Sequence, residues 1–365
     1  MIINGIETYS NRTVCLVHIF TDRGDGWGMT APFEADITAQ VVHRLAAPLV
    51  LNKEFNNFQD IADEIILQQY KFTGTFVARA AAGIDTALWD VVAKAEGKTV
   101  ADYIGRKTKE PVQLYGSSML RNPEPISAEA ERLSRLRERY GFRCFKIHPG
   151  ISVGKDADHY PGCTEEFIRV VREALPQEVG LWIDVNGNYS VRRAIEMAHY
   201  IKKMNCDLFE EPCPYWLLDD VKQVHEECKK IGLPVAAGEQ DYMETQWNKM
   251  ISEKIIDVAQ PDILYIGGFS RTLRIAKSCA QAGIPVTPHT GHQSPLLVFG
   301  ITLMSVVDMP HEFMECGIEA REWEHAMYRN PLVIADGQAS TLSGNGWGLE
   351  IDANWLAKSQ YQVSR

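Results

Sequence analysis

The sequence lacks an apolar segment long enough to cross a membrane as a helix. Its longest apolar run, residues 296–307, is interrupted by glycine, threonine and serine and stops at Asp308, which is short of the ~20 residues that a spanning helix needs. Near the N-terminus, Glu7 comes early and no basic stretch precedes an apolar one, so we expect no secretory signal. No membrane association is expected.

Paired cysteine motifs are also missing. The chain has 8 cysteines, and no two of them stand in a Cys-x-x-Cys arrangement. In a chain of this length, scattered cysteines are typical of buried, reduced thiols rather than of disulfides or zinc ligands. We therefore expect a cytoplasmic protein.

Basic residues are fewer than acidic residues in this sequence. Lysine and arginine number 37 against 48 aspartates and glutamates, which gives a net charge of −11. An acidic surface repels phosphate backbones, so nucleic acid is not an expected partner. A bound cation would neutralise part of this excess of acid.

From about residue 110, short apolar runs rich in β-formers alternate with longer amphipathic segments. The expected strands are 113–117, 144–148, 181–185, 208–211, 234–238, 258–263, 285–289 and 312–316, and the expected helices include 164–174, 191–204, 218–231 and 270–282. Eight repeats of strand and helix favour a parallel α/β barrel. An open, doubly wound sheet is the alternative that this pattern leaves.

The first 60 residues follow another pattern. Residues 2–9 and 13–21 alternate like two strands of a hairpin joined at Ser10-Asn11-Arg12, and a third short strand is expected near 26–29. Segments 37–62 and 76–96 are expected to be helical, and the glycine-rich residues 343–348 to form a turn. The chain therefore has an α+β region ahead of the barrel, and we count two domains.

Carboxylates end three successive expected strands. The residues are Asp184, Glu210 and Glu239, and the C-terminal ends of barrel strands form one mouth. Like charges this close cannot all stay ionised unless a cation lies among them. Oxygen ligands without a nearby cysteine or histidine favour Mg²⁺, with Mn²⁺ as second choice. The alternative is that these are ordinary solvated loop carboxylates.

Other ionisable groups stand at the ends of the remaining strands. Lys146 and His148 are two residues apart on an expected strand and so point to the same face. Lys146 can bind a substrate carboxylate, or act as a base if its pKa is lowered. Asp262 and His289, on neighbouring strands, can form a dyad in which the carboxylate orients the imidazole. His292 either takes part or only shapes its loop.

These residue types together indicate one chemistry. A divalent metal would hold a substrate carboxylate while a base on one face, His148 or His289, removes the proton α to it. The metal and a cation would stabilise the enediolate that develops. A metal-dependent hydrolase is disfavoured, because the first strand carries Tyr115-Gly116-Ser117 where such barrels have His-x-His.

The set of motifs resembles the enolase superfamily, and within it the mandelate racemase subgroup. The motifs that carry the resemblance are the alanine-rich segment 81–90 ending in Ala-Leu-Trp-Asp, Asp184-x-Asn186, Glu210-Glu211-Pro212, Gly238-Glu239, Gln260-Pro261-Asp262, His289 and the turn Gly344-Asn345-Gly346-Trp347-Gly348. The intervals from 184 to 210 and from 262 to 289 also suit that family.

The resemblance implies a (β/α)₇β barrel closed by a capping domain made of the N-terminal region and the C-terminal tail. We expect the capping domain over residues 1–110, the barrel over 111–330 and the returning tail over 331–365. It further implies that Asn186 and Glu315 bind substrate, that loops after Gly28 and around 50–75 set specificity, and that the protein is a homo-oligomer.

Within the subgroup we expect a dehydratase that converts a sugar acid, an aldonate or aldarate, into a 2-keto-3-deoxy acid. Polar residues of the 50–75 segment, such as Asn52, Asn56 and Lys71, would suit a polyol. A racemase or epimerase of a hydroxy or amino acid on the same scaffold is the alternative, and a non-catalytic binding protein is the remote one.

Two departures from the family pattern stand out. The second-strand motif is commonly Lys-x-Lys, whereas here it is Lys146-x-His148, so the base differs in pKa. Residues 150–163, with His159 and Tyr160 near their middle, are also longer than usual. This segment is expected to be a lid or a contact between subunits.

Overall fold

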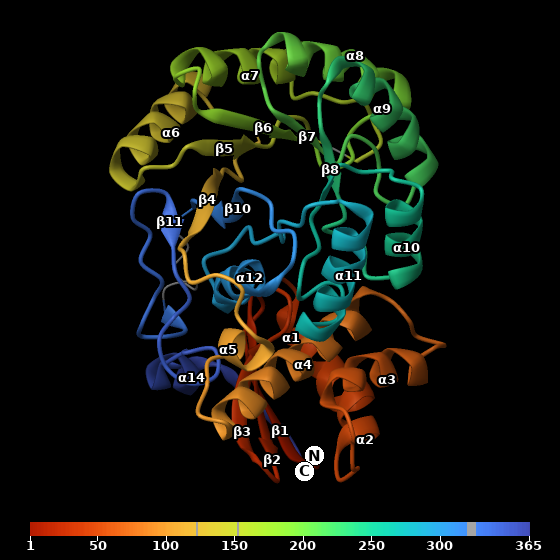
Figure 1. Ribbon diagram of the computed structural model, residues 1–365, viewed down its shortest axis with the longest axis vertical. Coiled ribbons are helices and arrows are strands. Elements are labelled where there is room, and N and C mark those ends of the chain that lie inside the picture. Colours follow the sequence, from red (N-terminus) through yellow and green to blue (C-terminus); the bar gives the residue numbers. More distant parts are fainter. Residues whose placement is uncertain (122, 152, 320–325) are drawn as a thin grey trace.

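A small antiparallel sheet opens the chain in the computed structural model, which describes residues 1–121, 123–151, 153–319 and 326–365. Strands β1 (Ile3–Ser10), β2 (Cys15–Thr21) and β3 (Gly24–Met29) pair in sequence, as the alternation predicts. The last strand, β12 (Gln360–Ser364), adds to the free edge of β1. Both ends of the chain therefore belong to one sheet, at the bottom of Figure 1.

The helices of this region differ from the expectation in one place. The predicted single helix over 37–62 is wrong: α1 (Ala35–Val41), a π-helical turn (Val42–Ala46) and α2 (Ala47–Val50) end before Leu51, and helix resumes with a 3₁₀ turn (Phe58–Asp60) and α3 (Ile61–Gln68). Asn52 has φ = 57° and Leu51 and Glu54 bridge to Ile3 and Ile2. These backbone pairings and the left-handed asparagine interrupt the helix.

Strand β3 lies directly on the long helix α4 (Thr75–Ala95), which is followed by the short α5 (Val100–Ile104). A Cβ atom placed on Gly28 would lie 2.4 Å from the backbone nitrogen of Ala87 and 2.5 Å from the carbonyl oxygen of Gly83. Glycine on the strand and small residues on the helix therefore permit this close approach.

In the described part of the chain, seven parallel strands curl into the barrel, in the spatial order β10-β4-β5-β6-β7-β8-β9. Their bounds are β4 (Val112–Ser117), β5 (Cys144–Ile147), β6 (Gly180–Asp184), β7 (Leu208–Glu210), β8 (Val235–Ala237), β9 (Val258–Ala259) and β10 (Met314–Gly317). The short β11 (Gln338–Ala339) pairs antiparallel with β4. The fold is thus the predicted parallel barrel, not a doubly wound sheet.

The expected seventh strand, 285–289, is reduced to single bridges. Val286 pairs with Ala259 on one side and with Pro310 on the other, so it carries the sheet from β9 towards β10. Pro285 and Pro288 flank this point and have no N–H to extend a ladder. The prediction of a continuous strand over 285–289 is therefore wrong, although the segment lies where that strand would stand, between β9 and β10.

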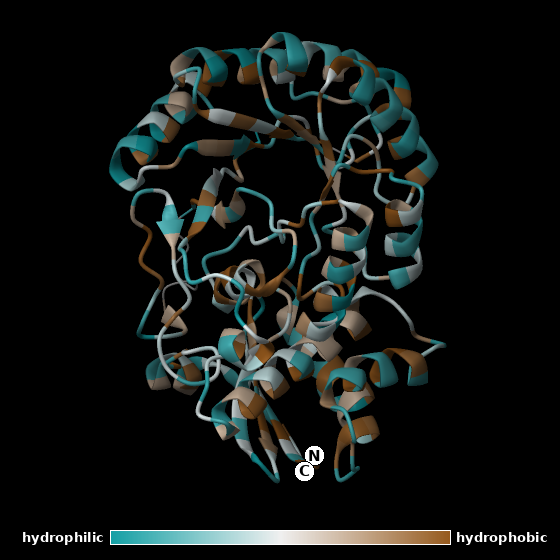
Figure 2. Ribbon diagram, in the orientation of Figure 1, coloured by the Kyte–Doolittle hydropathy of each residue, from teal (hydrophilic) through white to brown (hydrophobic). Residues whose placement is uncertain are grey.

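Amphipathic helices cover the outside of the barrel, with hydrophilic residues on their outer faces (Figure 2). They are α6 (Ile126–Tyr140), α7 (Cys163–Ala174), α8 (Val191–Lys203), α9 (Leu218–Ile231), α10 (Glu244–Ser252) and α11 (Phe269–Ala282), and the tail adds α14 (Ala353–Lys358). No helix in the described ranges is long and apolar enough to cross a membrane.

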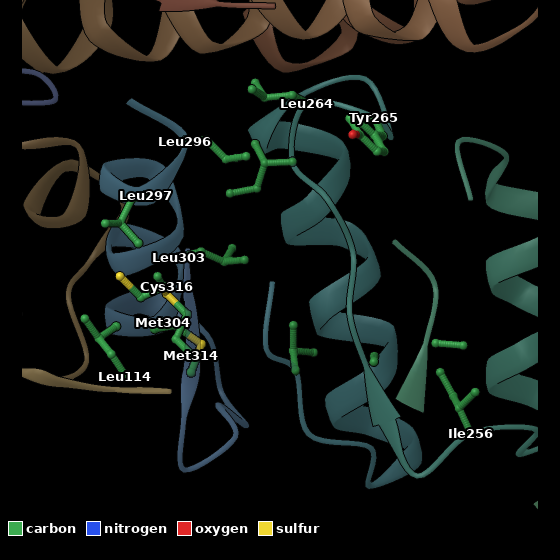
Figure 3. Packing of buried hydrophobic residues seen from close by; sticks show 14 of the residues in the cluster. Leu114, Ile256, Leu264, Tyr265, Leu296, Leu297, Leu303, Met304, Met314 and Cys316 are labelled. Carbon is green, nitrogen blue, oxygen red and sulfur yellow. The ribbon is translucent and has the colours of Figure 1, made fainter. Parts of the chain in front are cut away.

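Helix α12 (Pro295–Val306) contains the longest apolar run, and every one of its residues is buried. Leu297 and Leu303 lie near Leu114 of β4 and Met314 of β10 (Figure 3). On its other side α12 approaches α5 and β3. The run therefore serves as a core helix between the barrel and the N-terminal sheet.

Two residues of α4 join the N-terminal region to the rest of the chain. Asp85 Oδ2 accepts a hydrogen bond of 3.1 Å from Ser270 N, in the first turn of α11. Asp90 accepts bonds of 2.8 Å each from Trp27 N on β3 and from Trp347 N in the tail. The capping region thus includes N-terminal and C-terminal segments; the domain boundaries near residues 110 and 330 stay a prediction.

We expect the Asp85→Asn variant to gain stability over the wild type as pH rises. Burial raises the pKa of Asp85 to about 7 from 3.8, and the hydrogen bonds from Ser270 only partly oppose this shift. The folded wild type therefore holds a proton that the unfolded chain releases between pH 4 and 7, so its free energy of unfolding falls across that window, by on the order of 4 kcal/mol at most. Asparagine keeps the acceptor and has no such titration.

Denaturant unfolding of both proteins at pH 4.5, 6 and 8 measures this difference. Asp85→Ala is the matched control, because it removes both the charge and the acceptor for α11. A constant gap between Asp85→Asn and the wild type across these pH values would contradict the prediction.

Candidate active site

A cavity of about 420 Å³ opens where the barrel strands end. His148, Asn186, Glu239 and His289 line it, with Phe33 contributed by the loop between β3 and α1. Residues 50–75 contribute no side chain to it within the described part of the chain. Of the two loops expected to set specificity, only the one after Gly28 reaches the cavity, so the polarity of residues 50–75 no longer argues for a polyol.

Three carboxylates meet at the base of this cavity. Asp184 ends β6, Glu210 ends β7, and Glu239 follows β8. All three are buried, and one oxygen from each lies within 4.8 Å of the others. Parallel pairing explains this, since Asp184 and Glu210 are in direct register on neighbouring strands.

The electrostatics of this carboxylate cluster fit a hard divalent cation. Burial raises the pKa of Glu210 well above its usual value, and the nearby Asp184, Glu315 and Glu239 raise it further, against the opposing effect of Lys146. The cluster is thus short of positive charge, and all its donor atoms are oxygens. Asp184, Glu210 and Glu239 could therefore hold Mg²⁺ or Mn²⁺.

Lys146 is fully buried on β5 among these carboxylates. Its Nζ lies 2.6 Å from Glu210 Oε1, 3.0 Å from Glu315 Oε1 and 3.5 Å from Asp184 Oδ2. Burial alone would lower the pKa of Lys146, but Glu210 and Glu315 outweigh it and raise the pKa well above its usual value. The lysine is therefore a fixed cation, which favours an electrostatic role over that of a base.

His148 lies on the same side of its segment as Lys146, as their spacing predicts. Its Nε2 is 2.9 Å from Asp184 Oδ2, and its Nδ1 contacts the carbonyl oxygen of Ser118. Because a carbonyl only accepts, Nδ1 must carry the proton. The other nitrogen, Nε2, is then the atom directed at the cluster.

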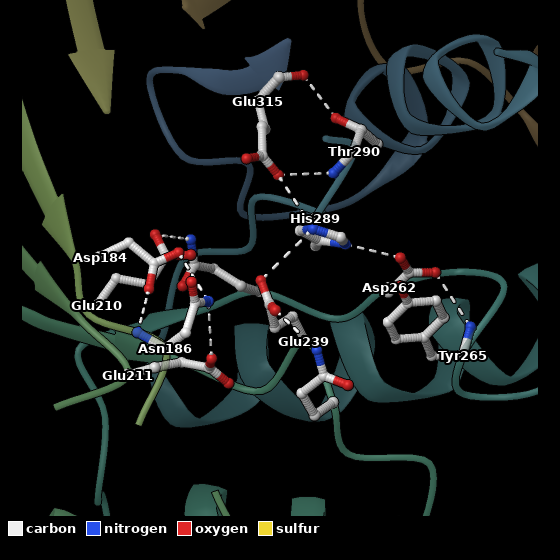
Figure 4. A network of polar contacts seen from close by, with 12 residues as sticks. Asp184, Asn186, Glu210, Glu211, Glu239, Asp262, Tyr265, His289, Thr290 and Glu315 are labelled. Atoms are coloured by element: carbon white, nitrogen blue, oxygen red, sulfur yellow. Dashed lines mark hydrogen bonds and ion pairs between the residues drawn. The ribbon is translucent and has the colours of Figure 1, made fainter. Parts of the chain in front are cut away.

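Asp262 and His289 form the expected pair, and His289 lies between Glu239 and Glu315 (Figure 4). Asp262 Oδ2 lies 2.7 Å from His289 Nδ1, and Asp262 Oδ1 accepts hydrogen bonds from the backbone nitrogens of Leu264 and Tyr265. His289 Nε2 faces Glu239 Oε2 at 3.5 Å. Burial would lower the pKa of His289, but Glu239, Glu315 and Asp262 raise it well above its usual value.

Asn186 and Glu315 also lie at the cluster. Asn186, with φ = 42°, donates from its side chain to Asp184 Oδ2 at 3.1 Å and to Glu211 Oε2 at 3.3 Å. Glu315 Oε2 accepts a bond of 2.8 Å from Thr290 N. Burial would raise the pKa of Glu315, but Lys146 and His289 lower it to about 2, so it is an anion.

Some residues singled out in the sequence lie elsewhere. His292 lines the cavity and packs edge-on against Phe33, with ring centroids 5.3 Å apart, but it is not in the carboxylate cluster. Tyr160 bonds to Glu166 on α7. In the 150–163 segment, of which residue 152 lies outside the described residues, Val153 lines the cavity. Backbone bonds tie this segment to the loop that follows β6.

Sequence reasoning missed several residues of the site, and four of them illustrate why. Glu211 is buried beside Asn186, Tyr265 lies 5.9 Å from His289 between ring centroids, and Arg121 and Trp216 line the cavity. Glu211 stands inside the Glu-Glu-Pro motif, and Tyr265 three residues after Asp262, so both had a signal in the sequence. Arg121 and Trp216 lie in loops with no pattern that marks them.

Comparison with known proteins places this fold and site in one class, the enolase superfamily. Residues 128–355 match the profile described as enolase C-terminal domain-like, and residues 2–105 match the mandelate racemase / muconate lactonizing enzyme N-terminal domain. The chain therefore belongs to the mandelate racemase / muconate lactonizing enzyme family.

Individual relatives agree with this assignment. A crystal structure from Roseobacter denitrificans, of a protein provisionally named a racemase, is 40% identical with a TM-score of 0.95 and full coverage of both chains. D-galactarolactone cycloisomerase of Agrobacterium fabrum is 29% identical over 76% of this chain and 73% of its own length. Arabinonate dehydratase of Saccharolobus solfataricus is 23% identical over 89% and 84%, respectively.

The structure of L-talarate dehydratase from Polaromonas sp. JS666, complexed with Mg and L-glucarate, shares the fold. It is 19% identical, with a TM-score of 0.83 and coverage of 100% of this chain and 99% of that one.

Replacing Lys146 by methionine should destabilise the metal-free protein and make it depend on metal. Without the ammonium group, the buried Glu210 and Glu315 lose their counter-charge, which typically costs about 3–5 kcal/mol. Thermal unfolding with EDTA and with excess Mg²⁺ measures this, and we expect Mg²⁺ to raise the Tm of the variant more than that of the wild type.

The matched control is Lys222→Met, since Lys222 forms a solvent-exposed pair with Glu253 and such pairs contribute little. Equal stability of Lys146→Met and the wild type in EDTA would show that Lys146 does not balance the cluster.

Proposed function

We propose that this protein is a divalent-metal-dependent dehydratase of sugar acids. It would remove the proton α to the substrate carboxylate and expel the β-hydroxyl, which leaves a 2-keto-3-deoxy acid. The observation that carries this proposal is the buried carboxylate cluster of Asp184, Glu210 and Glu239, with His148 on one side and the Asp262–His289 pair on the other.

Asp184, Glu210 and Glu239 would hold Mg²⁺, or Mn²⁺ in its place. When bound, the ion supplies Lewis-acid stabilisation of charge on a substrate carboxylate. Lys146, kept protonated by Glu210 and Glu315, provides a second positive charge at the same place. Removal of the α-proton places negative charge on the substrate carboxylate, and the proton is acidic enough only when that charge is neutralised. Lys146 would therefore lower the activation barrier of proton removal without transferring a proton itself.

The two histidines would divide the proton transfers. His148 has its Nδ1 proton on the Ser118 carbonyl, so Nε2, which lies beside Asp184, is the atom that would take the α-proton. His289 has a raised pKa and holds a proton that Nε2 can donate to the departing hydroxyl. Asp262 orients His289 and stabilises its cationic form. Asn186 and Glu315 would contact the substrate beside the metal.

The names of relatives support a sugar-acid substrate. Arabinonate, D-galactonate and L-talarate/galactarate dehydratases are among the curated relatives.

The family and the eight free, buried cysteines support a cytoplasmic enzyme. We also propose that the protein is a homo-oligomer.

A racemase or epimerase is the second candidate, because His148 and His289 face the cluster from two sides and could exchange one proton between two faces. Incubation with Mg²⁺ and candidate acids in D₂O separates the two. A dehydratase forms a 2-keto acid, detected with a carbonyl reagent, whereas a racemase returns the deuterated antipode without a keto product. We expect the keto acid.

Replacing Glu239 by glutamine should abolish turnover together with Mg²⁺ binding. The change removes a charged ligand from the cluster with little change of shape. Isothermal titration with Mg²⁺ and a keto-acid assay measure both properties. Glu253→Gln, at an exposed position, is the matched control.

Lys146→Ala completes the test, since it should lose activity while Mg²⁺ affinity survives. Full activity of Glu239→Gln in the presence of EDTA would rule out the metal-dependent reaction.

A further inference from the structure

Resting on the function proposed above, we infer that Arg121 binds a second, non-reacting carboxylate of the substrate, so that the preferred substrates are dicarboxylic sugar acids rather than aldonates. Three features of the cavity carry this inference: the placement of Arg121, its lack of an acidic partner among the described residues, and its link to the carboxylate cluster through Asn186.

Arg121 lies in the segment between β4 and α6, and its side chain lines the cavity. Its Nη2 donates a hydrogen bond to Asn186 Oδ1. Within the described part of the chain, this is its one hydrogen bond, and no carboxylate forms an ion pair with it. A guanidinium group has five N–H donors, so most of the donors of Arg121 remain for a ligand.

The charge of Arg121 is unusual in this cavity. Among the described residues that line the cavity, it is the only lysine or arginine, while Glu211 and Glu239 are acidic. The reacting carboxylate would be matched by the ion that the cluster would hold, with the ammonium group of Lys146 beside it. A monocarboxylic acid therefore needs no further cation for binding. Without Arg121, a second carboxylate would meet only the acidic side chains of Glu211 and Glu239.

The spacing suits a short dicarboxylate. Asn186 bridges the two regions, because its Oδ1 accepts from Arg121 and its Nδ2 donates to Asp184 Oδ2 at 3.1 Å. The guanidinium is thus separated from the cluster by one amide group and two hydrogen bonds. Arg121 therefore lies close enough to the cluster for one short ligand to contact both. Guanidinium groups bind carboxylates in a bidentate manner, which adds geometric selectivity.

Substrate preference in matched pairs tests this inference. The wild type, Arg121→Gln and Arg121→Lys are assayed with Mg²⁺ on galactarate against galactonate and on glucarate against gluconate, with keto-acid formation as the readout. We expect the wild type to favour the dicarboxylates in kcat/KM. Arg121→Gln should lower kcat/KM for dicarboxylates about 100-fold, mainly through KM, and for aldonates only a few-fold. Arg121→Lys should lie between.

The control variant is Arg192→Gln, since Arg192 is exposed on the outer face of α8 and pairs with Glu196. It should leave all four substrates unaffected. Titration of galactarate with Mg²⁺ into His289→Asn, with and without Arg121→Gln, measures binding apart from turnover. Weaker binding in the double variant is expected.

Each other outcome overturns the inference. An equal loss for both substrate classes would show that Arg121 only orients Asn186, and a wild-type preference for aldonates would exclude a dicarboxylate site. The proposed function fails in a different way: neither class would give a keto acid or exchange its α-proton in D₂O. In that case galactarate binding to the His289→Asn protein still decides whether Arg121 holds a carboxylate.

Discussion

Repulsion among buried carboxylates at the ends of β6, β7 and β8 is the constraint on which the site depends. Asp184, Glu210 and Glu239 bring three potential negative charges within 4.8 Å of one another in a buried place. Such a group is stable only with positive charge nearby. Lys146 supplies part of it through its contact with Glu210, and one ammonium group stands against three carboxylates of the cluster. The repulsion among these carboxylates destabilises the protein without a cation, and the same repulsion favours binding of a divalent cation.

The fold makes this concentration of charge possible. Parallel strands place their C-terminal ends at one mouth, and the barrel walls behind them are apolar. The N-terminal sheet and α4 are anchored to the barrel through Asp85 and Ser270, and to the tail through Asp90 and Trp347. These contacts bring the loop with Phe33 over the cavity. Residues that are distant in sequence thus line one cavity.

Much of the site was predictable because its geometry follows from local pattern. Asp184 and Glu210 end neighbouring parallel strands, and the C-terminal ends of such strands lie at one mouth, so their meeting followed from the strand pattern. The seventh strand was wrong in form because periodicity does not register the missing N–H groups of Pro285 and Pro288. The helix over 37–62 was wrong because backbone pairing of Leu51 and Glu54 with residues 2–3 joins segments that are far apart in the sequence.

By itself, the sequence determined the fold class and the residue types at the strand ends, since both depend on spacing along the chain. Only the tertiary structure decided which charges balance one another: that Lys146 stays a cation, that Ser118 sets the tautomer of His148, and that Arg121 reaches the cavity with no acidic partner among the described residues. Those properties arise from burial and from contacts between segments that are far apart in the chain. Periodicity carries no information about either.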